Sequence, residues 1–554
     1  MFSLHLFRSY WNNKKDLEID LYVCGWAEYD KIIYKSDNLI DLVSEKLKSL
    51  SIDLLNNFLL DLNGNFSFLI VSKDSIKVCA DKMRCYPVIY FKYNDTTYIT
   101  DDIDAFLQKY PSIRLIVNEN NIEQYLCTDF IFGPNTLFKN VFSLQAGEIV
   151  EITSNKYNRH QYFQWSPIMK VANHRDIYKE SSLLDTIFIS VIHRMINSAP
   201  KVHNWIIPLS GGHDSRMIVN YLYKLGVKNV ICYSFGVKNN WQSIISERVA
   251  KALGYEWFFI EHSQEILSEI QKSQVIDNYR KYAFNGTSVP HLQDFIAIYM
   301  LKKKEIIKSG DIIVPGHTLN FIAGDQLKMG MEVCDSINST IPYIKIHFSQ
   351  FGYAPKSVNV LNLVLSIIKN YNVDVNQIPE YFNWQEVHTK YIANWVKCYE
   401  YFGFEWRMPL WDNELINYWS KIGFNFRFDR KLFFLMERNY LLLDVLKDIP
   451  FANDILIKEK SLKDRIIESI PLFLKKIIRY LGYSKSTYFV PDGLHLLYSG
   501  KHETITEYQN KNSIPDVVLI YLSNYPGNMK LSSFSVNSVS TLMIINDYYN
   551  KVVD

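Results

Sequence analysis

The chain has 554 residues, of which 48% are hydrophobic and 21% charged, and its formal net charge is +2 at pH 7. This length exceeds what one compact core holds and predicts two or three domains of ordinary globular composition. The near-neutral charge gives no sign of a nucleic-acid partner, no apolar run is long enough to span a bilayer, and no signal peptide is evident at the N-terminus.

The first part of the chain alternates short apolar segments with Asp, Asn and Gly. Residues 59–71 read Leu-Leu-Asp-Leu-Asn-Gly-Asn-Phe-Ser-Phe-Leu-Ile-Val, and residues 80–90 contain Asp81, Arg84 and Pro87. Short alternating strands separated by such turn residues are typical of stacked β-sheets. We therefore predict a stacked-sheet domain over residues 1–165.

An apolar run from Asn204 ends in Ser210-Gly-Gly-His-Asp-Ser215, and an amphipathic segment follows directly. From Met217 the apolar residues recur at helical spacing until Gly226 stops the pattern. The segment therefore predicts a strand, a tight glycine turn and a helix.

The composition of this turn suits a pyrophosphate group. Gly211 and Gly212 let the backbone N–H groups approach an anion, and the helix start adds unpaired donors and a positive dipole end. Ser210 and Ser215 offer hydroxyl donors, while Asp214 can hold Mg²⁺ that bridges phosphate oxygens. The loop lacks the Gly-Lys-Ser/Thr of the Walker type and resembles the PP-loop ATP pyrophosphatases, which implies ATP and Mg²⁺. The alternative is an ordinary glycine turn in a parallel sheet.

The pattern continues as alternating strands and helices. We predict strands at 230–235, 257–260 and 311–315 and a helix at 243–253. This alternation predicts a doubly wound parallel sheet with helices on both faces, and ligands at the carboxyl ends of its strands.

At residues 315–325 the chain resembles the synthetase domain of the asparagine synthetase family, which includes β-lactam synthetases and lasso-peptide cyclases. That family reads Ser-Gly-Gly-x-Asp-Ser in its first loop and Ser-Gly-Glu-Gly-Ser-Asp-Glu-x-x-Gly-Gly in the later one. Gly316 and Gly324 match the later loop, whereas the family's glutamate falls on His317 and its metal-binding aspartate on Asn320. Asn offers a neutral oxygen, so we expect weaker magnesium binding than in relatives with two carboxylates.

The resemblance implies roles for further residues. Residues 407–412 resemble the family's Arg-x-Pro-Phe-Leu-Asp segment, which we interpret as an Arg–Asp pair that pins a loop. A pyrophosphate-binding lysine of the family falls on Lys458, although a lysine in a basic run is usually solvated surface. Gly316 is expected beside the ribose or the activated acyl group, and Lys458 and His317 are the candidate catalytic residues.

The N-terminal segments 59–71, 80–90 and 133–147 resemble the family's glutamine amidotransferase domain, which implies an Ntn-hydrolase-like fold. Such domains hydrolyse glutamine with a cysteine at the processed N-terminus, whose own amine is the base. Phe2 stands there instead, and Cys24 is expected to point inward from a strand. We therefore expect a degenerate domain that serves as a scaffold or docking module.

The seven cysteines are scattered, with an odd total and no CxxC pair. This pattern is typical of reduced thiols in a cytoplasmic protein and predicts no metal site built from cysteines.

The complete prediction is an α/β chain with three parts. A degenerate amidotransferase-like domain (1–165) precedes a PP-loop, asparagine synthetase-like domain (185–485) and a C-terminal extension (486–554). A basic amphipathic helix at 463–480 would pack on its own domain, on a partner or on a membrane surface.

The predicted function is that of an AMP-forming ligase that adenylates a small-molecule or peptide carboxylate and transfers it to an amine or ammonia. Ammonia would come from a separate source or amidotransferase, and a homodimer is an open alternative. Two other functions compete with it: amide closure within a peptide, and a non-catalytic assembly subunit. His317 and Asn320 favour the last, whereas the intact 210–215 loop favours an enzyme.

Overall fold

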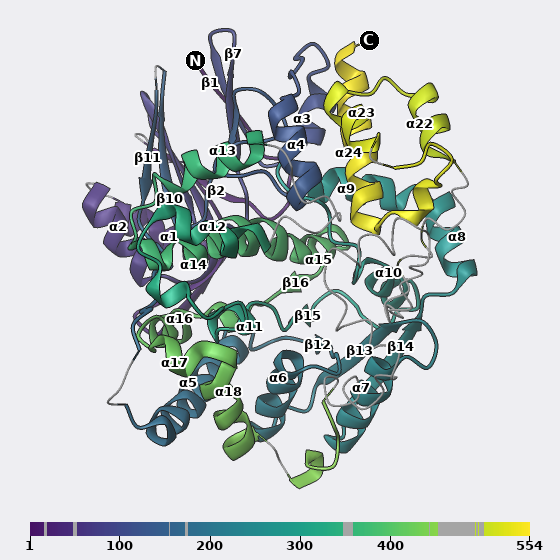
Figure 1. The fold of residues 1–554 in the computed structure, drawn as a ribbon. Helices are drawn as coiled ribbons and strands as arrows, with labels where there is room; N and C mark the ends of the chain where they lie inside the picture. The colour runs from purple at the N-terminus through teal and green to yellow at the C-terminus, as the bar shows by residue number, and fades with distance from the viewer. Residues whose placement is uncertain are drawn as a thin grey trace.

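The computed structural model describes residues 1–15, 19–47, 52–154, 156–171, 175–346, 358–441, 444–451, 494, 497, 503–523 and 525–553. Within these ranges the chain builds three β-sheets and the helices that cover them (Figure 1).

Two of the sheets belong to the N-terminal part of the chain. One has the strand order β1 (Phe2–His5), β8 (Thr96–Thr100), β7 (Ile89–Tyr93), β9 (Val141–Ser143). The other has the order β11 (Tyr157–Gln161), β10 (Glu148–Thr153), β6 (Ser75–Ala80), β5 (Asn63–Val71), β3 (Asp20–Tyr29), β2 (Asn12–Lys15), and β4 (Ile32–Lys35) pairs with β3. Residues 59–61, expected in the strand, instead end helix α2 (Ile52–Asp61).

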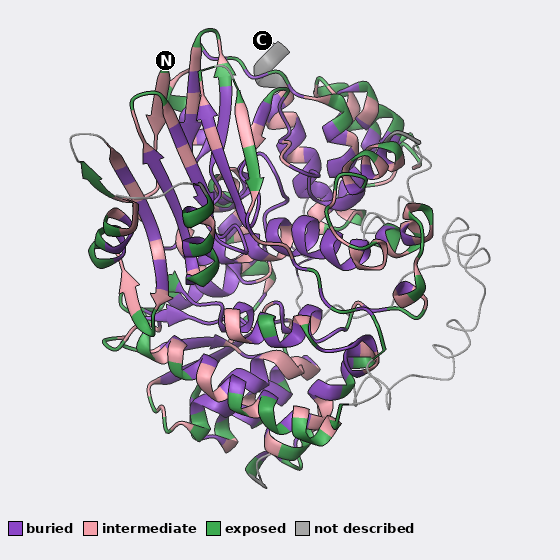
Figure 2. Ribbon diagram, turned by 90° about the vertical axis from the view of Figure 1, so that its left-hand side faces the viewer, coloured by how far each residue is buried: buried purple, intermediate pink, exposed green. Residues whose placement is uncertain are grey.

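The two sheets pack face to face because alternate side chains of both turn inward. Val78 of β6 and Val150 of β10 meet Tyr90 of β7 and Ile99 of β8 in one buried cluster. Helices α1 (Asp37–Leu47) and α2 cover the outer face of the larger sheet, while α3 (Ile103–Lys109) and α4 (Glu119–Thr128) cover that of the smaller one. The strands are mostly buried (Figure 2). This layering confirms the predicted stacked-sheet fold.

The third sheet is fully parallel. Its order is β14 (Glu256–Glu261), β13 (Val230–Gly236), β12 (Trp205–Pro208), β15 (Ile312–Ile313), β16 (Glu405–Trp406). Helices α6 (His213–Lys224) and α7 (Trp241–Ala252) lie on one side of it, and α10 (Phe295–Lys303) and α15 (Lys397–Tyr401) on the other (Figure 1). The predicted doubly wound sheet is confirmed. The strand expected at 311–315 is shorter and spans Ile312–Ile313.

Further helices pack around these sheets. The α-helices are α5 (Ile177–Asn197), α8 (Gln264–Lys272), α9 (Val275–Phe284), α11 (Leu319–Ile322), α12 (Ile337–Lys345), α13 (Val358–Ile368), α14 (Ile378–Phe382), α16 (Asn413–Ser420), α17 (Phe424–Arg427), α18 (Lys431–Met436), α22 (Ile505–Lys511), α23 (Asp516–Leu522) and α24 (Val536–Val553). Short 3₁₀ or π segments are η1 (Met331–Val333), η3 (Val375–Gln377), η4 (Asn383–Ile392), η5 (Ala393–Val396), η6 (Pro409–Trp411), η7 (Phe428–Arg430), η8 (Glu437–Leu441), η9 (Asp444–Leu446) and η11 (Leu531–Ser533).

The C-terminal helices pack on the N-terminal part of the chain. Figure 1 shows α22 to α24, in yellow, beside α4 and α9, and their apolar side chains join the cluster under the smaller sheet. Asn537 donates 2.9 Å hydrogen bonds to Asp129 Oδ2 and to the Tyr391 hydroxyl. The extension therefore bridges the end of α4 and η4, which lies between β15 and β16 in the chain. The domain boundaries predicted from the sequence, at residues 1–165, 185–485 and 486–554, stay predictions.

Asp129 gives the fold a pH dependence that can be tested. The residue ends α4 in a left-handed conformation (φ 70°), and burial raises its pKa from 3.8 to about 7. The folded protein therefore retains a proton that the unfolded chain releases, so stability falls as pH rises from about 4 to 7.

We expect Asp129→Asn, which keeps the bonding pattern and suits the left-handed backbone, to be more stable than the wild type at pH 8. The advantage should shrink by about 3 kcal/mol at pH 5, and Tm measured by calorimetry at both values tests it. The exposed Asp53→Asn, which changes the charge equally, is the control. An advantage for Asp129→Asn that is the same at both pH values would contradict the prediction.

Candidate nucleotide-binding site

The site lies at the carboxyl ends of β12 and β15, where the order of the parallel strands reverses. In doubly wound sheets this reversal opens a crevice between the two loops that leave in opposite directions. The loop after β12 carries Ser210 to Ser215, and the loop after β15 carries Gly316 to Asn320. The structure thus brings together the two segments that the sequence singled out.

Two serines hold the first loop closed. The Ser210 N–H donates to Ser215 Oγ (3.0 Å), the two hydroxyls lie 3.1 Å apart, and the Gly212 N–H donates to Ser210 Oγ (3.2 Å). No side chain caps α6, whose N-cap is Gly212. Since the first N–H groups of a helix have no intrahelical acceptor, this open start is suited to an anion.

The second loop touches the first through a glycine. A Cβ on Gly316 would lie 2.8 Å from the Ser215 nitrogen and 3.2 Å from the Asp214 carbonyl carbon. Any larger residue would push the two backbones apart. Gly324, at the end of the same loop, has φ +103° and would meet the Arg427 carbonyl oxygen at 2.3 Å. The two glycines that match the asparagine synthetase family are therefore both required by backbone packing.

Asp214 and Asn320 are neighbours, as the sequence predicts. The Asn320 N–H donates to Asp214 Oδ2 (3.2 Å), and Arg430 Nη2 donates to Asp214 Oδ1 (2.7 Å). The Asn320 side-chain oxygen accepts from the Phe321 N–H (2.9 Å).

These donors are compatible with magnesium only as part of a larger set. Among the described residues no group of three or more His, Cys, Asp or Glu is placed to hold a metal. One carboxylate and one amide oxygen leave most of an octahedral shell to water and phosphate oxygens, which is how magnesium usually binds with a nucleotide. Asp214 would hold the ion and Asn320 would assist.

His317 is a neutral imidazole in this site. Its Nε2 is buried with no hydrogen-bond partner in the described chain, and its ring lies 4.4 Å from that of Trp395. Burial lowers the pKa of His317 to about 3, and burial together with the neighbouring His317 imidazole lowers the pKa of His291 to about 3. Such weak bases stay uncharged at neutral pH but accept protons poorly, so His317 suits hydrogen bonding to a substrate better than general-base catalysis.

Further contacts at the site were not predicted either. His213 Nδ1 lies 2.8 Å from Glu437 Oε2, and its ring stacks on Phe451 at 3.9 Å. Arg216 donates to the carbonyls of Ile449 and Pro450 (3.0 and 2.7 Å). Arg216 thereby fixes the segment that leads toward Lys458, although Lys458 and the predicted helix at 463–480 lie outside the described residues.

The expected Arg407–Asp412 pair is wrong. Arg407 donates to Ser198 Oγ (2.7 Å), whereas Asp412 accepts from Arg194 Nη1 (2.7 Å) and from Asn63 Nδ2 (2.9 Å). Both side chains found closer partners on elements remote in sequence. Asp412 also caps α16. Its contact with Asn63 joins the segment to the N-terminal part of the chain.

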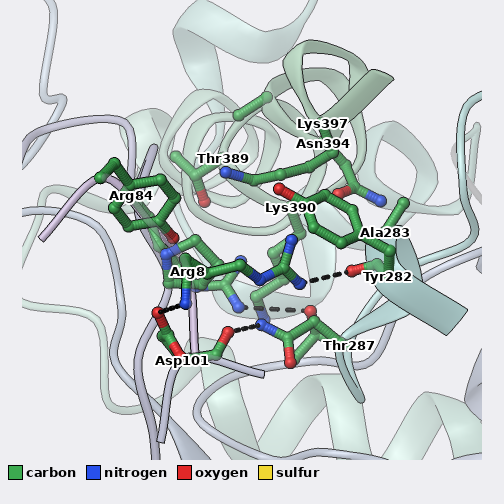
Figure 3. Close-up of a pocket in the computed structure, with 14 residues that line it drawn as sticks. Arg8, Arg84, Asp101, Tyr282, Ala283, Thr287, Thr389, Lys390, Asn394 and Lys397 are labelled. Atoms are coloured by element: carbon green, nitrogen blue, oxygen red, sulfur yellow. Dashed lines mark hydrogen bonds between the residues drawn. The ribbon is translucent and has the colours of Figure 1, made fainter. Parts of the chain in front are cut away.

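A second polar cavity lies between the halves (Figure 3). Arg8 donates to the Tyr282 carbonyl and pairs with Asp102, both at 2.9 Å, and Lys390 faces the cavity from η4. Its volume of about 20 Å³ is room for roughly one water molecule. In this conformation the cavity has no space for a substrate.

The thiols of the chain are poorly placed for nucleophilic chemistry. Six of the seven cysteines are buried and Cys334 is half-buried. Burial raises the pKa of each thiol, to about 12 for Cys79 and Cys127. Cys24 points inward from β3 and donates to the Ser67 carbonyl, as expected. Phe2 lies in β1 and packs on the cluster between the two sheets.

Comparison with known proteins finds two similarities in sequence. Residues 45–163 match the family described as a glutamine amidotransferase domain. The chain is 21% identical over 247 residues to "Putative asparagine synthetase [glutamine-hydrolyzing] 2" of Methanocaldococcus jannaschii. The match covers 43% of this chain and 45% of the relative, so the chain is similar to that protein over less than half of its length.

Solved structures with partial similarity include two enzymes. The NH3-dependent NAD synthetase of Campylobacter jejuni is 12% identical and has a TM-score of 0.20, with 38% of this chain and 96% of that chain covered. The glutamine phosphoribosylpyrophosphate amidotransferase of B. subtilis is 11% identical, with 56% and 63% covered and a TM-score of 0.19. The fold of the chain is defined by its own strand order. In its described part, no helix combines the length and apolar character needed to cross a bilayer.

The contact at Gly316 yields a prediction. Gly316→Ala should separate the two loops, because its Cβ would meet the Ser215 nitrogen. We expect a non-hydrolysable ATP analogue with Mg²⁺ to bind about tenfold or more weakly, since overpacking typically costs about 1–3 kcal/mol. Titration calorimetry measures the affinity. Gly226→Ala, at the far end of α6, adds a Cβ that meets no atom within 4 Å but strains a backbone with φ +74°, so it is the control for lost stability without a change in loop contact. Equal affinities in both variants would exclude loop contact as a requirement for binding.

Proposed function

We propose that the chain is an ATP-dependent amide ligase of the asparagine synthetase type that releases AMP and pyrophosphate. The carboxylate of its substrate attacks the α-phosphorus of ATP, and an amine or ammonia then displaces AMP from the acyl-adenylate. Ser210, Gly211, Gly212 and Ser215 hold the phosphates, Asp214 and Asn320 hold Mg²⁺, and Gly316 borders the ribose or acyl group.

The observation that carries this proposal is the meeting of two loops at the reversal point of the parallel sheet. The uncapped start of α6, the Asp214 carboxylate and Asn320 lie together where the two loops meet. A nucleotide needs donors for its phosphates and a ligand for its metal, and these residues supply both. Lys458 would follow the charge on the leaving pyrophosphate.

The proposal includes no glutamine hydrolysis by this chain. Glutamine hydrolysis in such domains needs a thiolate, and the thiols of the chain are kept protonated by burial. We infer that the N-terminal domain is a scaffold and that nitrogen comes from ammonia, a separate amidotransferase or the substrate's own amine.

A groove beside the site supports a second candidate, a ligase that closes an amide within a peptide. The groove has a volume of about 840 Å³, and its lining combines apolar side chains such as Ile177, Phe424 and Phe434 with the charged side chains of Glu332, Asp429, Lys431 and Arg438. The Phe434 ring lies 5.0 Å from the ring of His213 in the 210–215 loop. A groove of this size is suited to a substrate larger than an amino acid.

Product analysis tests the reaction class. The purified protein, given ATP, Mg²⁺, ammonia and a panel of carboxylates from aspartate to apolar peptides, should form AMP and pyrophosphate. Asp214→Asn should lower the rate about hundredfold or more, because the metal ligand loses its charge. Chromatography of the nucleotides identifies the products. Formation of ADP, or a rate that is unaffected in Asp214→Asn, would contradict the proposal.

Nitrogen tracing tests the inactive amidotransferase domain. With ¹⁵N-amide glutamine as the only nitrogen donor, the purified chain should release no labelled ammonia and place no label in the product. Added ¹⁵N-ammonium is the control that shows whether the ligase accepts free ammonia. A thiol-directed glutamine analogue should label none of the cysteines, because burial disfavours their thiolates. Glutamine-derived label in the product without a second protein would restore a glutamine-dependent enzyme.

A further inference from the structure

Arg430 holds the carboxylate on which the candidate metal site depends. Its Nη2 lies 2.7 Å from Asp214 Oδ1, and the two side chains are only 9% and 18% exposed. The guanidinium carbon lies 4.4 Å and 5.2 Å from the ring centres of Phe433 and Phe434. The cation is therefore fixed between two aromatic rings and one acid.

The backbone at this point adopts an unusual conformation to place the cation. Asp429 and Arg430 are both left-handed, with φ of 53° and 57°. Two successive left-handed residues that carry side chains are unfavourable, and such conformations concentrate at functional sites. They interrupt the helical conformation between α17 and α18, and this interruption directs Arg430 toward Asp214 of the 210–215 loop.

Arg430 also has an unused donor. Its Nε is buried and has no hydrogen-bond partner among the described residues. A buried donor without an acceptor costs free energy, and an anion with several acceptor oxygens would remove that cost. A guanidinium offers five donors in one plane, which suits a phosphate group.

Arg430 occupies the carboxylate that a free divalent ion would need. Asp214 is the single carboxylate in the two predicted metal-ligand positions, because Asn320 is neutral. Glu437, an acid in the same region, lies against His213. Arg430 neutralises Asp214 in the absence of ligand, so a free divalent ion would meet a carboxylate that is already paired with a positive charge.

We propose that Arg430 is a resident counter-cation of Asp214 that excludes free magnesium and moves onto the triphosphate when the magnesium–nucleotide complex binds. This inference rests on the proposed function and adds the order of binding to it. Metal enters together with nucleotide, because only the triphosphate supplies the negative charge that releases Asp214 from Arg430.

Three proteins test the proposal: the wild type, Arg430→Met and Arg430→Lys. Binding of Mn²⁺ alone, read by electron paramagnetic resonance, and binding of α,β-methylene-ATP with Mg²⁺, read by calorimetry, are measured for each. Arg430→Met should bind Mn²⁺ alone about tenfold or more tightly than the wild type and bind the analogue about tenfold or more weakly. These opposite shifts distinguish a counter-cation from an arginine that only pins α18 to α6.

Arg430→Lys keeps the charge but loses the planar set of donors. It should exclude free Mn²⁺ as the wild type does and lose part of the analogue affinity. It also keeps the test informative if Arg430→Met does not fold, because Lys binding the analogue as tightly as Arg would overturn the phosphate role.

The outcomes separate this inference from the proposed function. A wild type that binds Mn²⁺ alone as tightly as Arg430→Met does would overturn the inference. So would an Arg430→Met variant that matches the wild type in both measurements while the wild type binds the analogue. A wild type that does not bind the analogue with Mg²⁺ overturns the proposed function, and the inference with it.

Discussion

The close approach of two backbones at Gly316 is the constraint on which the candidate site depends. The β15 loop can reach the start of α6 only because no Cβ separates Gly316 from Ser215. That contact places the Asn320 N–H on Asp214 and leaves the first turn of α6 open. The parallel sheet supplies the crevice, and the glycine determines how narrow it is. The chemistry of the site then depends on which charges line that crevice.

Charge at the site is balanced by residues from distant parts of the chain. Asp214 stands on α6, Asn320 on α11 and Arg430 just before α18. In the absence of ligand every one of these groups has a partner within the protein, so the site is neutralised rather than exposed as a bare acid. A nucleotide that binds here would therefore replace some of these interactions within the protein by its own contacts with Asp214, Asn320 and Arg430.

The sequence predicts those loops, strands and helices that depend on residues close together in the chain. The 210–215 loop was predicted because glycines, serines and an acid sit between an apolar run and a helical pattern, and the order of strands followed from that alternation. Arg430 was missed because its contact joins residues 216 positions apart and no glycine marks the left-handed turn. The Arg407–Asp412 pair was wrong for a related reason, since Arg194 and Ser198 reach those side chains from α5 and the residue after it.

The junction between the two halves has a consequence for how such a chain can evolve. Within η4, the buried Lys390 donates to the carbonyls of Ile131 and Gly133, and Glu386 accepts from the Gly133 N–H. The loop from the first half thus completes the hydrogen bonding of an ion pair that belongs to the second. Single mutations can remove a catalytic residue from the first half and leave these hydrogen bonds in place. Deletion of the whole first half would instead leave the buried Lys390 and Glu386 without the backbone groups of Ile131 and Gly133. Selection on the second half alone is enough to retain the first.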